Sequence, residues 1–122
     1  MLSEADQELR DRIGLTPEMI SQFCKKWSIS KLELFGSVLR SDFTPESDID
    51  FLVSFSPGAR RGLFTRIQIM HELEDLTTRR VDVITRKSIE DSENWIRRRE
   101  ILTTVKAIYD GGEASVLGID AD

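Results

Sequence analysis

Three aspartates in this sequence have the spacing of metal-binding carboxylates. Asp48 and Asp50 flank a single isoleucine at the start of the apolar segment 48–55, and Asp82 lies between two valines. Side chains two apart on a strand point the same way, so Asp48 and Asp50 should share one face with Cα atoms about 6.5–7 Å apart. Two carboxylates held this close oppose each other's ionisation unless a cation lies between them. Hard oxygen ligands of this kind favour Mg²⁺ or Mn²⁺.

Asp82 can complete this group if its strand lies beside the first one. When Val81 and Val83 enter the core, Asp82 projects from the opposite face of its strand, and neighbouring strands lie about 4.8 Å apart. Three carboxylates on two adjacent strands can hold two metal ions about 3.5–4 Å apart, an arrangement suited to in-line phosphoryl displacement. The alternative interpretations are solvated turn acids for Asp48 and Asp50, and a solvent-facing edge residue for Asp82.

A glycine–serine pair precedes these acids at the point where a strand passes into a short helix. Gly36 permits close approach of the backbone to a phosphate, and Ser37 offers both a hydroxyl and an amide. Arg40 could add a charged fork on the same phosphates. The segment is not a P-loop, because it lacks the glycine–lysine–serine/threonine ending. The glycine–serine pair alone predicts little, but together with the acids it predicts a nucleoside-triphosphate site.

Two stretches, 36–43 (GSVLRSDF) and 47–53 (SDIDFLV), resemble the signature of the DNA polymerase β-like nucleotidyltransferase superfamily. The length resembles that of its minimal nucleotidyltransferases. One departure is Ser41, where many relatives have glycine, but this change removes no proposed ligand. In the superfamily the glycine–serine pair binds triphosphate, the paired acids bind metals, and a third acid on a later strand completes the site. The resemblance assigns these roles to Gly36, Ser37, Asp48, Asp50 and Asp82.

The resemblance also implies a reaction and a partner. Minimal members of this kind often act as antitoxins, which transfer AMP from ATP to a tyrosine of a HEPN-domain ribonuclease toxin. Two Mg²⁺ ions (or Mn²⁺ in their place), ATP as substrate and a HEPN-type toxin as partner are therefore expected. Arg40 and Ser47 are counted with Gly36 and Ser37 as nucleotide-binding residues. Asp82 would in addition polarise the acceptor hydroxyl.

Two other functions fit the same residues. The domain could neutralise a toxin by masking it without catalysis, or it could transfer a nucleotide to a small molecule such as an aminoglycoside. Enzymes that modify small molecules generally need an extra domain to enclose the acceptor, and 122 residues leave no room for one. We therefore expect the acceptor pocket to come from a partner chain.

Hydrophobic periodicity predicts the elements that position the site. The expected helices are a short one with a capping box at Ser3, one over 17–27 started by Thr16 and Pro17, one over 63–76 and one over 92–109. The expected strands are 31–35, 48–55 and 80–85, and residues 38–40 would form a single helical turn. This order implies an α/β (α+β) fold in which helices pack on a small mixed sheet.

The remaining conspicuous side chains have structural interpretations. His71 is expected at the boundary of an amphipathic helix. Arg97 to Arg99 fan around the last helix and should be solvated, although they could contact triphosphate or an acidic partner. Tyr109 could be core or a partner contact. The other large aromatic residues considered are all expected in the core: Trp27, Phe35, Phe51, Phe55 and Trp95.

Composition and length set the outer limits. The 122 residues suit one domain, with a nucleotidyltransferase domain over 16–109, an N-terminal extension over 1–15 and a flexible acidic tail over 110–122. A net charge of −5 argues against direct nucleic-acid binding. Cys24 is the single cysteine and cannot form an internal disulfide. No signal peptide or membrane span is expected, so the protein should be cytoplasmic.

Overall fold

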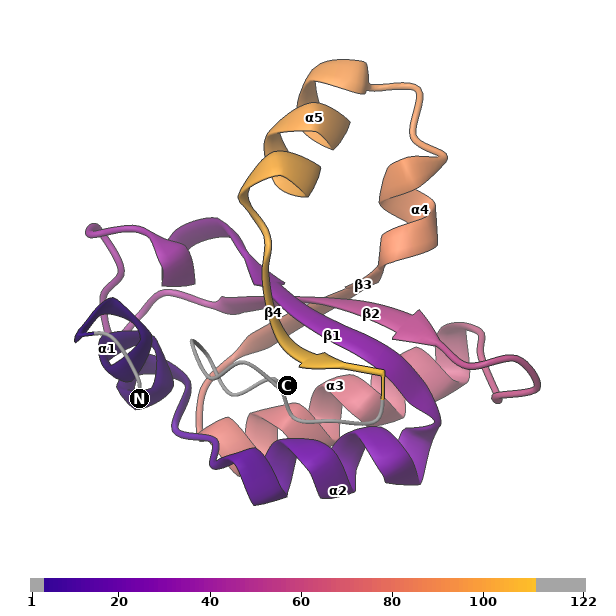
Figure 1. Cartoon of the computed structure of the whole chain (residues 1–122), viewed down its shortest axis with the longest axis horizontal. Helices are drawn as coiled ribbons and strands as arrows, with labels where there is room; N and C mark the ends of the chain where they lie inside the picture. Colours follow the sequence, from indigo (N-terminus) through magenta and orange to yellow (C-terminus); the bar gives the residue numbers. More distant parts are fainter. Residues whose placement is uncertain (1–3, 112–122) are drawn as a thin grey trace.

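A computed structural model describes residues 4–111 as a mixed sheet with helices on both faces (Figure 1). The helices are α1 (Glu4–Ile13), α2 (Pro17–Trp27), α3 (Leu63–Thr77), α4 (Arg86–Glu90), α5 (Trp95–Thr104) and the short 3-10 helix η1 (Gly36–Leu39). The strands are β1 (Ile29–Phe35), β2 (Ile49–Phe55), β3 (Val81–Thr85) and β4 (Lys106–Asp110). The predicted fold class is therefore confirmed.

The four strands lie in the order β3-β2-β1-β4. β1 pairs antiparallel with β2 and with β4, whereas β2 and β3 run parallel. A parallel pair needs a crossover, and α3 provides it between β2 and β3. The sheet thus brings the start of β2 beside the start of β3, where the predicted acids lie.

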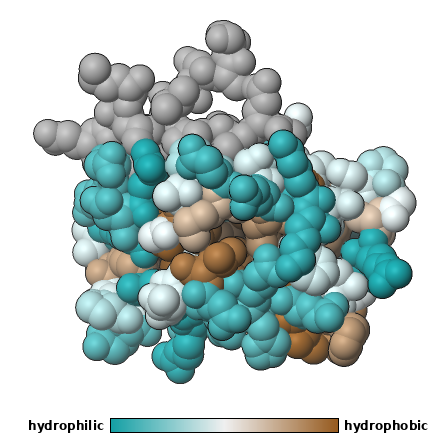
Figure 2. Space-filling view, turned by 90° about the horizontal axis from the view of Figure 1, so that it is seen from below, coloured by the Kyte–Doolittle hydropathy of each residue, from teal (hydrophilic) through white to brown (hydrophobic). Residues whose placement is uncertain are grey.

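The two faces of the sheet are covered unequally. α2 and α3 pack along the whole of one face, whereas α4 and α5 stand over part of the other (Figure 1). The larger core lies between the sheet and α2, α3, and includes Phe23, Leu32, Phe51, Ile69 and Leu73. The outer surface on the side of α2 and α3, seen in Figure 2, is mainly hydrophilic around an apolar hollow. We call the opposite face, which carries Phe35 and Leu52 beneath α4 and α5, the site face.

The two N-terminal helices show how local sequence sets their limits. The Thr16 hydroxyl accepts a hydrogen bond from the Met19 amide at 3.2 Å, and Pro17 occupies the first turn, so α2 begins as predicted. Ser28 ends α2 in the left-handed conformation, with φ of 55°. α1 buries Leu9 and Ile13, although its predicted capping residue Ser3 lies outside the described residues.

The last helix was predicted over 92–109, and this prediction is wrong after Thr104. α5 ends at Thr104, and residues 106–110 form β4 instead. The β-branched run of Thr103, Thr104 and Val105 has low helix propensity, and β1 has a free edge on which β4 pairs. Tyr109 is buried in this strand opposite Leu32 rather than on a helix face.

Several smaller expectations are also corrected. Trp95 is not a core residue, because the first turn of α5 projects from the molecule and leaves this side chain 59% exposed. α3 begins at the predicted Leu63, but Leu63 and Ile67 are exposed rather than packed on the core. β1 begins at Ile29, earlier than predicted, and Asp48 directly precedes β2.

The structure also bears on the expected membrane spans, the acidic tail and the single cysteine. Within residues 4–111, no helix is long and apolar enough to cross a membrane. The predicted acidic tail begins at Asp110, the last residue of β4, but residues 112–122 lie outside the described residues. Cys24 is buried in α2 as a free thiol, and burial raises its pKa to about 12.

Candidate active site

The glycine–serine turn lies where β1 passes into η1. Gly36 has φ of +78°, a conformation that favours glycine. A Cβ atom added at this position would collide with Oδ2 of Asp50, so the absent side chain lets the backbone lie against that carboxylate. Ser37 follows and donates its hydroxyl to the Asp48 carbonyl at 3.4 Å. The turn and the paired acids therefore form one continuous site.

Asp82 lies beside Asp50, as the sequence predicts. The two residues are direct partners in the parallel pairing of β2 and β3, and Phe35 on β1 is the partner of Asp50 on the other side. Val81 and Val83 are buried, which turns the exposed Asp82 toward the site face. Phe35, Asp50 and Asp82 thus form one row across three strands.

Asp50 is the most strongly perturbed acid of the site. Burial, with smaller contributions from the charges of Asp82 and Asp48, raises its pKa from 3.8 to about 6, and the charge of Arg40 acts in the opposite direction. The coupling to Asp48, Asp82 and Arg40 indicates that all three lie close enough to influence Asp50. This is the electrostatic condition that a bound cation would relieve.

Asp48 is oriented by an arginine that sequence analysis did not identify. Its Oδ1 atom lies 3.3 Å from Nε of Arg80, and the Asp48 and Arg80 side chains are 50% and 78% exposed. Arg80 directly precedes β3, and its carbonyl accepts the Ile49 amide at the start of β2. The ion pair is therefore positioned by the same strand pairing that brings the acids together.

The donor chemistry fits a hard divalent cation, but the carboxylates are not gathered around one point. Asp48, Asp50 and Asp82 offer only oxygen ligands, which is the donor set that Mg²⁺ prefers. Among residues 4–111, however, no group of three or more acidic, histidine or cysteine side chains is arranged to hold a metal ion. Asp48 would have to leave Arg80 to join the other two.

The other predicted nucleotide-binding residues differ in their freedom to bind a ligand. Arg40 is 59% exposed and pairs with Asp42 at 3.1 Å between Nε and Oδ1. The Ser47 hydroxyl already accepts the Thr44 amide at 3.0 Å and so stabilises the turn before Asp48. His71, for which no binding role was predicted, pairs with Glu74 on α3. α3 packs on the sheet face opposite the site face, so His71 lies away from the site.

The three consecutive arginines of α5 have a structural role in part. Nη1 of Arg98 donates to the Ser92 carbonyl at 2.6 Å, which ties α5 to the loop before it. Arg97 and Arg99 are exposed. The prediction that these residues are mainly solvated is consistent with this arrangement.

A cavity opens beside the glycine–serine turn on the site face. It has a volume of about 450 Å³, and Phe35, Gly36 and Arg40 line its inner side. Glu100, Ile101 and Thr104 of α5 line its outer side. Sequence analysis could not place α5 here, because nothing in the local pattern specifies which sheet face a helix covers.

Comparison with known proteins identifies a nucleotidyltransferase domain. The family model described as a nucleotidyltransferase domain matches residues 17–108. Two proteins of Methanocaldococcus jannaschii, each named as a putative protein adenylyltransferase, are 36% identical over 64 residues. Each match covers 52% of this chain, and the matches cover 64% and 67% of the two relatives, so the chain matches less than two thirds of the first.

Solved structures share the fold. A structure described as a putative minimal nucleotidyltransferase has a TM-score of 0.60 and 27% identity, over 83% of this chain and 93% of that one. A crystal structure of a toxin–antitoxin with AMP-PNP also has a TM-score of 0.60, with 17% identity over 79% of this chain and 74% of that one. At that identity the second likeness supports the fold alone.

Proposed function

This chain belongs to the nucleotidyltransferase domain family, and from that premise we propose that it transfers AMP from ATP to a hydroxyl of a partner protein. The observation that carries the proposal is the contact of Gly36 with Asp50, in a row that continues to Asp82. The relatives named as protein adenylyltransferases favour a protein acceptor. We further propose that the acceptor is a tyrosine of a HEPN-type toxin in the cytoplasm, and that the modification neutralises it.

Each residue of the site has a separate proposed role. Asp48, Asp50 and Asp82 would hold two Mg²⁺ ions, which supply Lewis-acid stabilisation of the phosphoryl oxygens when bound. The backbone of Gly36, the Ser37 hydroxyl and the Arg40 guanidinium would bind the departing phosphates. Asp82 would accept the proton of the attacking hydroxyl. The oxygen then bonds to the α-phosphorus, the bond to pyrophosphate breaks, and pyrophosphate leaves.

The surroundings of the site suit a nucleotide on one side and a protein on the other. The 450 Å³ cavity that begins at Gly36 and Arg40 has room for a nucleoside. Asp82 lies on the edge strand β3 and is exposed. A hydroxyl presented by a second protein can therefore reach Asp82 without entering that cavity.

Radiolabel transfer tests the proposal directly. The protein is incubated with Mg²⁺, α-labelled ATP and the protein encoded beside it, and label on that partner is quantified. We expect Asp48→Asn and Asp82→Asn to reduce the labelling rate by about a hundredfold or more, because each removes a ligand or the base. Asp75→Asn, which alters an exposed acid on α3, is the control and should label normally. Undiminished labelling by the two site variants would refute the assignment.

A further inference from the structure

The loop 40–48 connects the two halves of the proposed site. It begins at the C-terminal end of η1, whose first residues are Gly36 and Ser37, and it ends at Asp48. It contains neither helix nor strand, and it carries Arg40 and Asp48 at its two ends. Thr44 and Ser47 are hydrogen-bonded to each other within the loop, and its other restraints come from neighbouring elements.

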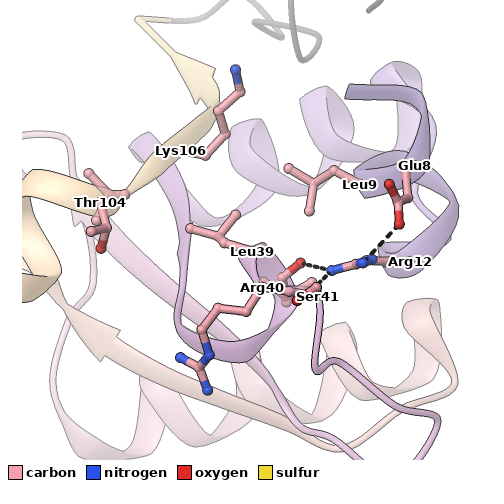
Figure 3. Close-up of a pocket in the computed structure, with 10 residues that line it drawn as sticks. Glu8, Leu9, Arg12, Leu39, Arg40, Ser41, Thr104 and Lys106 are labelled. Atoms are coloured by element: carbon pink, nitrogen blue, oxygen red, sulfur yellow. Dashed lines mark hydrogen bonds and ion pairs between the residues drawn. The ribbon is translucent and has the colours of Figure 1, made fainter. Parts of the chain in front are cut away.

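An arginine of α1 holds the first part of this loop. Nη1 of Arg12 donates to the Val38 carbonyl at 2.8 Å and to the Arg40 carbonyl at 2.5 Å. Nη2 of the same residue pairs with Glu8 at 2.9 Å, which fixes the guanidinium in place. Figure 3 shows Arg12 reaching from α1 to the backbone of Arg40, while the Arg40 side chain points away from it. The backbone of Arg40 is thus anchored, and its side chain, which pairs with Asp42, lies apart from this anchor.

A second arginine holds the other part of the loop. Arg79 directly precedes Arg80, and its Nη2 donates to the Thr44 carbonyl at 2.7 Å and to the Ser47 carbonyl at 3.1 Å. Both guanidinium groups also lie over the Phe43 ring, with the Arg79 carbon 4.4 Å and the Arg12 carbon 5.3 Å from its centroid. Aromatic rings attract cations at such distances. Phe43 therefore links the two anchors.

We propose that Arg12 and Arg79 are positioning residues that clamp the loop 40–48 and so hold its two ends, Arg40 and Asp48, in place for the proposed site. The proposal rests on the proposed function above. Arg12 lies before residues 17–108, the segment that the family model matches, so α1 adds this contribution to the family's own domain. At Arg12 a guanidinium is required because Nη1 bonds the two carbonyls while Nη2 pairs with Glu8 and the group lies over Phe43, whereas a lysine has a single nitrogen for all of these contacts.

Two variants and a matched control test the clamp by activity. Arg12→Ala and Arg79→Ala should lower kcat/KM for ATP about tenfold to a hundredfold, with a higher KM for ATP and a higher Mg²⁺ requirement, because a misplaced site loses orientation. Arg12→Lys should recover only part of the loss. Arg61→Ala removes a guanidinium–carbonyl bond to Ser56, away from the site, and should keep wild-type kinetics. Wild-type kinetics in both Arg12→Ala and Arg79→Ala would overturn the proposal.

Amide hydrogen exchange separates failure of the clamp from failure of the proposed function. The Arg40 amide donates to the Ser37 carbonyl, and the amides of Thr44 and Ser47 are hydrogen-bonded within the loop, so their exchange reports the order of the loop without any reaction. They should exchange at least tenfold faster in Arg12→Ala and Arg79→Ala than in wild type or Arg61→Ala. If wild type does not label any partner but the exchange result holds, only the proposed function fails. Unchanged exchange would overturn the clamp whatever the activity.

Discussion

At the scale of the residue, Asp50 is held where its ionisation is unfavourable. Its pKa of about 6 in the folded protein exceeds its ordinary value of 3.8, chiefly because the side chain is buried and then because Asp82 and Asp48 are near. Between these two values the folded state keeps a proton that the unfolded state releases. Stability therefore falls as pH rises through this window, and above pH 6 the ionised carboxylate opposes folding.

Asp50→Asn should consequently stabilise the metal-free protein. We expect a melting temperature about 5 °C higher than wild type at pH 7.5, with the difference shrinking as pH is lowered toward 4. Calorimetry at several pH values with a chelator present measures this. Added Mg²⁺ should raise the melting temperature of wild type more than that of the variant, because the cation relieves repulsion that the variant lacks. A variant less stable than wild type at pH 7.5 without metal would contradict this account.

At the scale of the element, a buried ion pair between the site face of the sheet and α4 joins β1 to this helix. Glu33 is only 2% exposed, although residues 31–34 alternate between polar and apolar in the sequence as a half-buried strand would. Nη1 of Arg86 donates to both carboxylate oxygens of Glu33, at 2.6 and 2.7 Å, while Lys31 lies 3.8 Å away. These hydrogen bonds raise the pKa of Arg86. The alternation conceals this pair, because it predicts that Glu33 faces solvent.

Breaking this pair from one side should be costly. Arg86→Ala removes both short hydrogen bonds of the buried Glu33 carboxylate and leaves it only the longer contact with Lys31. We therefore expect a loss of about 3 kcal/mol in the free energy of unfolding. Replacing Glu33 and Arg86 together by leucine should recover most of that loss. Lys87→Ala, which breaks an exposed pair with Asp91, is the control and should cost about 0.5 kcal/mol or less. Urea denaturation measures all three, and equal losses for Arg86→Ala and the control would contradict the prediction.

At the scale of the whole molecule, two mechanisms fit the proposed antitoxin function: modification of the proposed toxin partner, or masking of it. The catalytic interpretation needs the acids, whereas masking needs only the surface around them. The exposed side chains of Trp95 and Ile96 at the start of α5 show that the surface has apolar residues which a partner could cover. Both mechanisms therefore fit the shape of the molecule, and only variants of the acids distinguish them.

Growth of cells that carry the proposed toxin partner distinguishes the two mechanisms. We expect Asp48→Asn to lose protection together with labelling, because an unmodified toxin stays active. Asp75→Asn should protect as well as wild type. Co-purification of Asp48→Asn with the toxin verifies that binding survives the substitution. Full protection by a variant that cannot label would show that masking is sufficient.

Features that depend on near neighbours along the chain can be predicted from the sequence alone. Gly36, Ser37, Asp48 and Asp50 lie in one short stretch, and their strand–turn–strand setting follows from local periodicity and glycine chemistry. The capped start of α2 at Thr16 was equally local. Placing Asp82 opposite Asp50 required only the inference that two buried strands pair, and the structure confirms that pairing.

Contacts between segments far apart in the sequence depend on the three-dimensional fold. Arg12 and Arg79 reach the loop 40–48 from elements far along the chain, and Arg80 meets Asp48 through strand pairing. Residues 106–110 became β4 because β1 had an edge to pair, which outweighed the helical spacing of Tyr109. Local patterns encode propensity and facing, whereas which surfaces meet depends on the packing of the whole chain.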